Sequence, residues 1–291
     1  MPGKSVRFWF CLPAIILLLL CCATAQVPAP ANGSVHGWFG NLTFNEVHDS
    51  QVGYSTLLGA GVGYDLNRKL SVSTGIPFYL ISAISQTKKT TGETVVKQHE
   101  AQIGDYWLRL DAQPYSGFVT WKANVAGTAP TGNTKYGLSS GRATWTNAHH
   151  LEKDVAFLTP FVEATVGNTV PNNKRYLRNY TTLGYVSMQT GGVDFDLTHG
   201  FSFESAAYEV TPFGDQKVYS RVGKNGKLKQ VTEGTASLTK DHGFSGGLSF
   251  TAGHRISCDL DYTRSITDHI DAVTLSFNYR FGHVMPEKKK Q

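Results

Sequence analysis

The sequence predicts an all-β protein: an antiparallel up-and-down transmembrane β-barrel of about twelve strands behind an N-terminal signal peptide. Three observations predict this class. Segments of roughly ten residues alternate between large apolar and small or polar residues, short turns alternate with long polar loops, and the chain opens with an export signal.

The export signal is the first element. Lys4 and Arg7 give it a basic start, residues 8–20 are mostly apolar, and Ala23-Thr24-Ala25 is a small-residue cleavage site. The apolar run is short for a membrane-spanning helix, which needs roughly 20 residues, so we expect cleavage. The predicted organisation is a signal peptide at 1–25, a linker at 26–34, the barrel at 35–281 and a charged, disordered tail at 282–291.

Composition limits the function of the mature chain. Only Cys258 of the four cysteines remains, so no internal disulfide can form. Because Cys258 lies on the apolar face of a strand, we expect a buried or lipid-facing thiol rather than a nucleophile. The formal charge of +5 comes mainly from the signal and the lysines of the tail. The body is nearly neutral and has no basic stripe, which argues against nucleic acid as a partner.

The last strand shows the two-residue period most clearly. In AVTLSFNYRFGH (272–283), large apolar residues stand at every odd position from Val273 to Phe281, and small or polar residues lie between them. This period gives a strand one apolar and one polar face. The same period marks residues 58–66, 70–80, 105–111, 119–125, 244–252 and 256–263. In chain order, we place strands at 35–44, 52–66, 69–85, 101–112, 117–128, 142–151, 156–167, 181–197, 201–212, 242–253, 255–265 and 270–281.

The connections between these strands alternate in length. YDLNRKLSV (64–72) and FDLTHGFSF (195–203) are near-copies of one tight hairpin. Further short turns lie at 112–119, 151–157 and 252–260, and long polar loops lie at 86–99, 129–141, 168–180 and 213–241. Short periplasmic turns and long outer loops are typical of outer-membrane barrels. An even strand number places both ends of the barrel on the periplasmic side.

A secreted β-sandwich would also alternate, so the choice depends on other features. The polar faces carry ionisable residues in mid-strand, several strands exceed the roughly 5–6 residues typical of soluble sheets, and aromatic residues gather near strand ends. Lipid also requires a closed sheet, because an open edge leaves backbone groups unpaired. These features favour a barrel in the outer membrane of a Gram-negative bacterium, in contact with outer-membrane lipid and inserted by the barrel-assembly machinery.

Residues 104–168 resemble a known family. GDYWLRLDAQPYSGFVTWKANVAGTAPTGNTKYGLSSGRATW, followed by LTPFVEATVGN, is similar to outer-membrane barrels of the MetA-pathway phenol-degradation type. The matching motifs are Gly104-Asp105, Pro130-Thr131-Gly132 and Gly137-Leu138-Ser139-Ser140-Gly141. The resemblance implies a porin-like channel or transporter that passes or binds small hydrophobic or aromatic compounds. The residues after Phe281 depart from it, since such barrels often end on this aromatic residue.

Charged residues on the polar faces are the candidate lumen-lining and solute-contacting residues. They could select solutes through a transverse field, or they could pair and fill a narrow interior. They are Asp105, Arg109, Asp111, Lys122, Glu204, Asp259, Asp261 and Arg280. Loop 129–141 could fold inward as a constriction or turn in solvent. Its bendable motif contains Pro130, Thr131, Gly132, Gly137 and Gly141.

No catalytic residue, metal site or cofactor is predicted. His149 and His150 should point to opposite faces of one strand, so they cannot share a metal ion. The sequence around Ser140 imitates a hydrolase nucleophile motif, but no helix follows to form the required elbow. Three functions stay open: a channel for a small-molecule solute, a structural or adhesive barrel without an open pore, and an outer-membrane acyl hydrolase. The sequence specifies neither the solute nor the oligomeric state.

Overall fold

The computed structural model describes residues 34–49, 53–67, 69–82, 84–87, 94–97, 102–134, 138–178, 180–198, 200–220, 232–236, 240–253, 255–281 and 283–285. The predicted signal peptide and residues 26–33 of the predicted linker lie outside this part of the chain.

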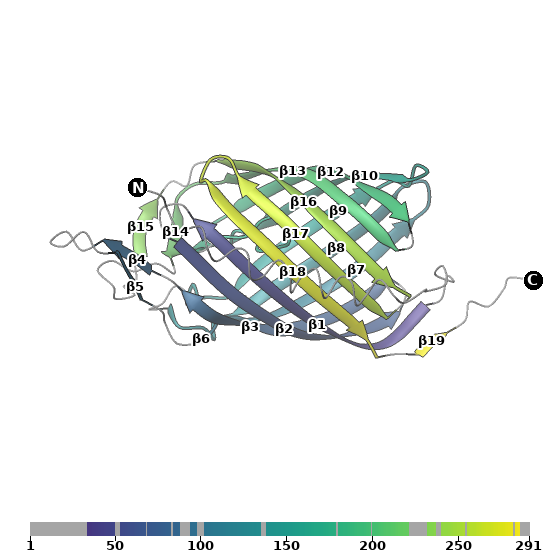
Figure 1. The fold of residues 1–291 in the computed structure, drawn as a ribbon, viewed down its shortest axis with the longest axis horizontal. Helices are drawn as coiled ribbons and strands as arrows, with labels where there is room; N and C mark the ends of the chain where they lie inside the picture. The colour runs from purple at the N-terminus through teal and green to yellow at the C-terminus, as the bar shows by residue number, and fades with distance from the viewer. Residues whose placement is uncertain are drawn as a thin grey trace, which may run out of the picture.

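Twelve strands in this part of the chain form a closed antiparallel barrel (Figure 1). They are β1 (Ser34–Asp49), β2 (Gly53–Asn67), β3 (Leu70–Ser82), β7 (Tyr106–Ser116), β8 (Thr120–Ala129), β9 (Thr144–Glu152), β10 (Leu158–Gly167), β12 (Val186–Thr198), β13 (Phe201–Pro212), β16 (Asp241–Ala252), β17 (Ile256–Ser265) and β18 (Ile270–Arg280). Each strand pairs with the next, and β18 pairs with β1 from Phe39↔Arg280 to Asp49↔Ile270. This pairing closes the sheet and confirms the predicted fold class.

Short elements lie at the two ends of the barrel. We call the end with the tight hairpins the turn end and the opposite one the loop end. Figure 1 shows β4 (Ile84–Thr87), β5 (Thr94–Lys97), β14 (Gln216–Ser220) and β15 (Thr232–Ala236) at the loop end. β6 (Gln102–Ile103) pairs with β3, and β11 (Tyr180–Leu183) pairs with β14. In the described residues, no helix is long and apolar enough to cross a membrane.

The structure corrects some predicted boundaries. β1 continues five residues past the expected end at residue 44, and the expected strand 181–197 divides into β11 and β12, which belong to different sheets. The expected strand 101–112 likewise divides into β6 and β7. Residues 283–285, expected to be disordered, form β19 (His283–Met285), which pairs with residues 34–36 of β1 at the turn end.

The apolar strand faces point away from the barrel interior. In β18, Phe277 is 43% exposed, whereas Ala272 and Thr274 on the opposite face are 2% and 3% exposed. A soluble sandwich would bury its apolar face instead. Other exposed apolar residues at alternate positions are Leu42, Val62, Leu108, Val125, Val162 and Leu248. The polar backs of the strands therefore enclose the interior, and the apolar faces are suited to lipid.

Candidate functional site: a loop in the lumen and the charged cavity beside it

The connection between β10 and β11 enters the barrel, and we call residues 168–178 the lumen loop. Tyr176 is buried in an apolar cluster with inward residues of β12 and β13, among them Met188 and Val210. Leu177 is buried in a second cluster with Val47, Ile270 and Ala272 of β1 and β18. The loop thus contacts two different parts of the wall. A long loop was predicted at 168–180, but its turn into the barrel, where Tyr176, Leu177 and Arg178 are buried, was not.

Arg178 anchors the lumen loop to the wall. Its side chain is fully buried and forms an ion pair with Asp241 of β16. It donates hydrogen bonds to the Leu177 carbonyl at 2.7 Å and to the Tyr208 hydroxyl at 3.2 Å, and its guanidinium lies 3.8 Å from the centre of the Tyr176 ring. A buried arginine with a carboxylate partner and several acceptors is a fixed structural group rather than a mobile one.

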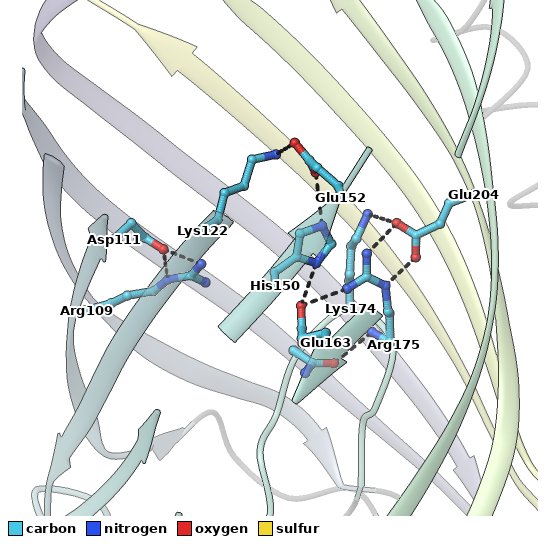
Figure 2. Close-up of polar contacts among 10 residues, drawn as sticks. Arg109, Asp111, Lys122, His150, Glu152, Glu163, Lys174, Arg175 and Glu204 are labelled. Carbon is cyan, nitrogen blue, oxygen red and sulfur yellow. Dashed lines mark hydrogen bonds and ion pairs between the residues drawn. The ribbon is translucent and has the colours of Figure 1, made fainter. Parts of the chain in front are cut away.

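Lys174 and Arg175 bind carboxylates of the wall (Figure 2). Arg175 donates to both carboxylate oxygens of Glu204, with Nη2 at 2.8 Å from Oε2, and to Glu163 at 3.2 Å. Lys174 Nζ lies 2.9 Å from Glu204 and 3.8 Å from Asp261. Burial opposes protonation of this loop lysine, but the two carboxylates outweigh that effect and raise the pKa of Lys174 above its usual value. The loop cations therefore neutralise an acidic part of the wall.

The polar contacts continue from Glu163 to β8. His150 Nδ1 lies 3.3 Å from a carboxylate oxygen of Glu163, and His150 Nε2 lies 3.0 Å from one of Glu152. Glu152 also forms an ion pair with Lys122 at 2.6 Å. Figure 2 shows this as one chain of charged side chains from β8 to β13. His149 points outward, where Trp121 Nε1 lies 3.3 Å from its Nδ1. The prediction that the two histidines face opposite ways is confirmed.

A cavity of about 710 Å³ lies on the turn-end side of Lys174 and Arg175. Both signs of charge line it, including Arg109 and Asp111, which form an ion pair at 2.5 Å, and Arg280, which lies 3.3 Å from Asp65. Among the predicted lumen residues, the structure places five on this lining: Arg109, Asp111, Lys122, Glu204 and Arg280.

The other predicted residues lie around the cavity. Asp261 contacts Lys174, and Asp259 precedes it by two residues on the same face of β17. Asp105 stands before β7, where it accepts a hydrogen bond from the Gly132 amide at 2.9 Å. Burial raises the pKa of Asp105 even though backbone donors of the 131–140 segment act against the rise.

Loop 129–141 packs on the start of β7. Thr131 Oγ1 accepts a hydrogen bond from the Tyr106 amide at 2.8 Å and lies 3.2 Å from the Gly104 carbonyl. Pro130 and Thr131 are exposed, Gly141 has a left-handed φ of 68°, and Gly137 lies outside the described residues. The lumen loop is a described segment that contacts two separate parts of the wall, whereas the constriction role of loop 129–141 stays a prediction.

Known proteins resemble this chain in fold but not in sequence. No protein-family model and no curated protein matches the chain. Among solved structures, the chain is similar to the COG4313 outer membrane channel from Pseudomonas putida F1, with a TM-score of 0.54 and 11% identity over 89% of this chain and 98% of that one. The fold is that of an outer-membrane β-barrel. The MetA-pathway resemblance at the level of a family stays a prediction.

Two porins have lower similarity to the chain. The KdgM porin has a TM-score of 0.47 and 6% identity over 83% of this chain and 99% of that one. The NanC porin has a TM-score of 0.47 and 10% identity over 83% of this chain and all 100% of that one.

The serine of the hydrolase-like motif is buried and bonded to backbone. Ser140 is 3% exposed, and its hydroxyl donates to the Arg142 carbonyl at 2.9 Å. Its described hydrogen-bond partner is thus backbone rather than an imidazole. Within the described residues, no three His, Cys, Asp or Glu side chains are grouped so that they could hold a metal ion.

Sequence reasoning missed the cations of the lumen loop. Lys174, Arg175 and Arg178 lie in NNKRYLR, which looks like an ordinary exposed loop. One signal was present: Tyr176 and Leu177 place two large apolar residues between arginines, which is unusual for a loop that turns in solvent. Glu163, Glu204 and Asp261, which Lys174 and Arg175 contact, stood on the predicted polar faces, but nothing in the sequence indicated these pairs. Asp241, the partner of Arg178, lies just before the predicted strand 242–253.

Proposed function

We propose that the protein is an outer-membrane channel that passes small solutes through its barrel and is narrowed by the lumen loop. The observation that carries this proposal is the loop itself. It is held to the wall by a buried ion pair at Arg178, by two small apolar clusters, and by ion pairs of Lys174 and Arg175. Lys174 is 37% exposed, so its ion pairs can be broken and remade. Beside the loop lies a charged cavity large enough for a small molecule.

The lining of the cavity adds a requirement for the solute. The family resemblance implies small hydrophobic or aromatic compounds. Charged groups such as Arg109, Lys122 and Glu204 dominate the cavity, so we expect a solute that also carries a polar or ionised group. The apolar outer face suits outer-membrane lipid, and we propose that the barrel-assembly machinery inserts the chain after its export through the periplasm.

A structural or adhesive barrel is the second candidate. The burial of Tyr176, Leu177 and Arg178 inside the barrel favours it, because this part of the loop fills space that an open pore would need. An acyl hydrolase has less support, because the Ser140 hydroxyl is buried and bonded to backbone. If hydrolysis did occur, Ser140→Ala would have to abolish it.

Electrical recording separates the first two functions. We expect purified protein in planar bilayers to conduct, and liposomes that contain it to swell in small solutes. The variant Lys174→Gln/Arg175→Gln removes the charges that hold the loop to Glu204, so its conductance should exceed that of the wild type. Lys240→Gln is the matched control, because this lysine is 66% exposed and pairs with Glu209 outside the lumen. Silence of both wild type and loop variant, with no swelling, would establish the structural function instead.

A further inference from the structure

Two aromatic rings lie on glycines of the inner wall. The Trp107 ring covers Gly61 and Gly75, since a Cβ would stand 3.0 Å from Cζ2 at Gly61 and 2.6 Å from it at Gly75. The Phe39 ring covers Gly63, where a Cβ would stand 2.2 Å from Cζ. Gly61 and Gly63 share one face of β2 and are about 7 Å apart. The rings from β7 and β1 therefore lie over neighbouring positions of β2, and we call them the aromatic patch.

Two arginines flank the aromatic patch in one row across the sheet. Arg280 pairs with Phe39, Phe39 with Gly63, Gly63 with Ser73, and Ser73 with Arg109. Residues paired in this way point to the same side of a sheet. The Arg280 guanidinium lies 5.8 Å from the centre of the Phe39 ring, and Arg109 follows the Trp107 position by two residues on the same face. Arg280 is therefore close to the Phe39 ring at one end of the row, and Arg109 is two residues from Trp107 at the other end.

These two arginines retain donor capacity. Arg280 binds Asp65 through Nε at 3.3 Å, and Arg109 binds one oxygen of Asp111 through Nε at 2.7 Å and Nη2 at 2.5 Å. A guanidinium has five N–H donors, so both keep donors that these contacts do not use. Their side chains are 45% and 46% exposed, and both line the cavity.

The arginines of the lumen loop differ in this respect. Arg175 and Arg178 have side chains that are 11% and 0% exposed, and each forms an ion pair with a carboxylate of the wall. They hold the loop, whereas Arg109 and Arg280 are open to a solute in the cavity.

We propose that the aromatic patch with Arg109 and Arg280 binds small aromatic carboxylates. The ring of such a solute stacks on Trp107 or Phe39, and its carboxylate takes the free donors of the neighbouring guanidinium. Glycines behind the rings keep this wall flat, so the solute lies along it. The inference names a solute class for the proposed channel and depends on that function for its biological role, but binding itself needs no flux.

Equilibrium binding to the folded protein in detergent micelles tests the proposal. The probes are benzoate, benzamide with the same ring and no charge, and acetate with the charge and no ring. Titration calorimetry should show benzoate binding at least tenfold more tightly than either of the others. Arg109→Gln/Arg280→Gln and Phe39→Leu should each weaken benzoate binding tenfold or more. If the double variant does not fold, Arg109→Gln and Arg280→Gln are measured separately, and each should weaken benzoate binding.

Arg264→Gln is the matched control, because Arg264 pairs with Asp271 on the outer face of the barrel. It should bind benzoate as the wild type does. Equal binding of benzoate and benzamide, or unchanged binding after loss of both arginines, overturns the site. Benzoate binding without conductance would support the binding site and contradict the channel function. Conductance without benzoate binding would support the channel function and contradict the binding site.

Discussion

Gly75→Ala should destabilise the barrel through a clash that neither neighbour can relieve. A Cβ at Gly75 would stand 2.3 Å from the Ala60 carbonyl oxygen and 2.6 Å from Cζ2 of Trp107. The carbonyl belongs to the β2–β3 pairing and cannot move without breaking it. The Trp107 ring packs on the same glycines, so the added methyl group overpacks this part of the wall. Overpacking of this kind costs about 1–3 kcal/mol in well-packed interiors, and the free energy of unfolding should fall by this amount.

Gly191→Ala is the matched control for this substitution. It adds the same methyl group to a strand of the same barrel, but nothing lies within 4 Å of its Cβ position. The gain from restricting the unfolded chain is about 0.4–1 kcal/mol, so this variant should be as stable as the wild type or more so. Urea unfolding in micelles, followed by tryptophan fluorescence and by the gel shift between folded and unfolded barrel, measures both. A Gly75→Ala barrel at least as stable as Gly191→Ala would refute the assignment of Trp107 to the inner wall.

Three further predictions concern charged side chains. Arg178→Met should lower the free energy of unfolding by about 3–5 kcal/mol, because it leaves Asp241 buried without its counter-charge, and urea unfolding of the variant measures the loss. Because the pKa of Lys174 is raised above 10.5, its stabilisation is complete below pH 10.5 and disappears as pH rises through the folded-state pKa. The difference in free energy of unfolding between the wild type and Lys174→Gln, measured in urea, should therefore shrink as pH rises above 10.5. Glu209→Gln should leave the urea midpoint unchanged, because its pair with Lys240 is exposed.

The sheet was predictable because lipid and lumen impose opposite demands on alternate residues. The predicted strand 201–212 has the same bounds as β13. A tight hairpin before it and the apolar alternation along it determine both its register and its ends. The division of 181–197 was not predictable in the same way. Tyr180–Leu183 has strand-like residues, but its partner β14 lies more than thirty residues further along the chain, beyond a complete barrel hairpin.

The candidate site was predictable only in part. Arg109 and Asp111 were found because a charge in mid-strand is conspicuous when the alternate residues are apolar. The lumen loop was missed because polarity marks both a solvent loop and a loop inside a wet barrel. Trp107 stood on a predicted polar face without an explanation, and the glycines that it covers lie on other strands, so their contact appears only when the register is known.

The charges on the loop also determine how it should open. Glu163, Glu204 and Asp261 face a shared interior, and without Lys174 and Arg175 they would repel one another. Lys174 is 37% exposed to the cavity, so salt screens its pairs, whereas the fully buried ion pair of the loop's last arginine is protected. Rising ionic strength should therefore loosen the 174–175 segment first and leave the C-terminal anchor in place. We expect conductance to rise faster than bulk solution conductivity between 0.1 and 1 M KCl, where the screening length falls from about 10 Å to about 3 Å. Strictly proportional conductance in the wild type would show that these ion pairs do not hold the loop across the pore.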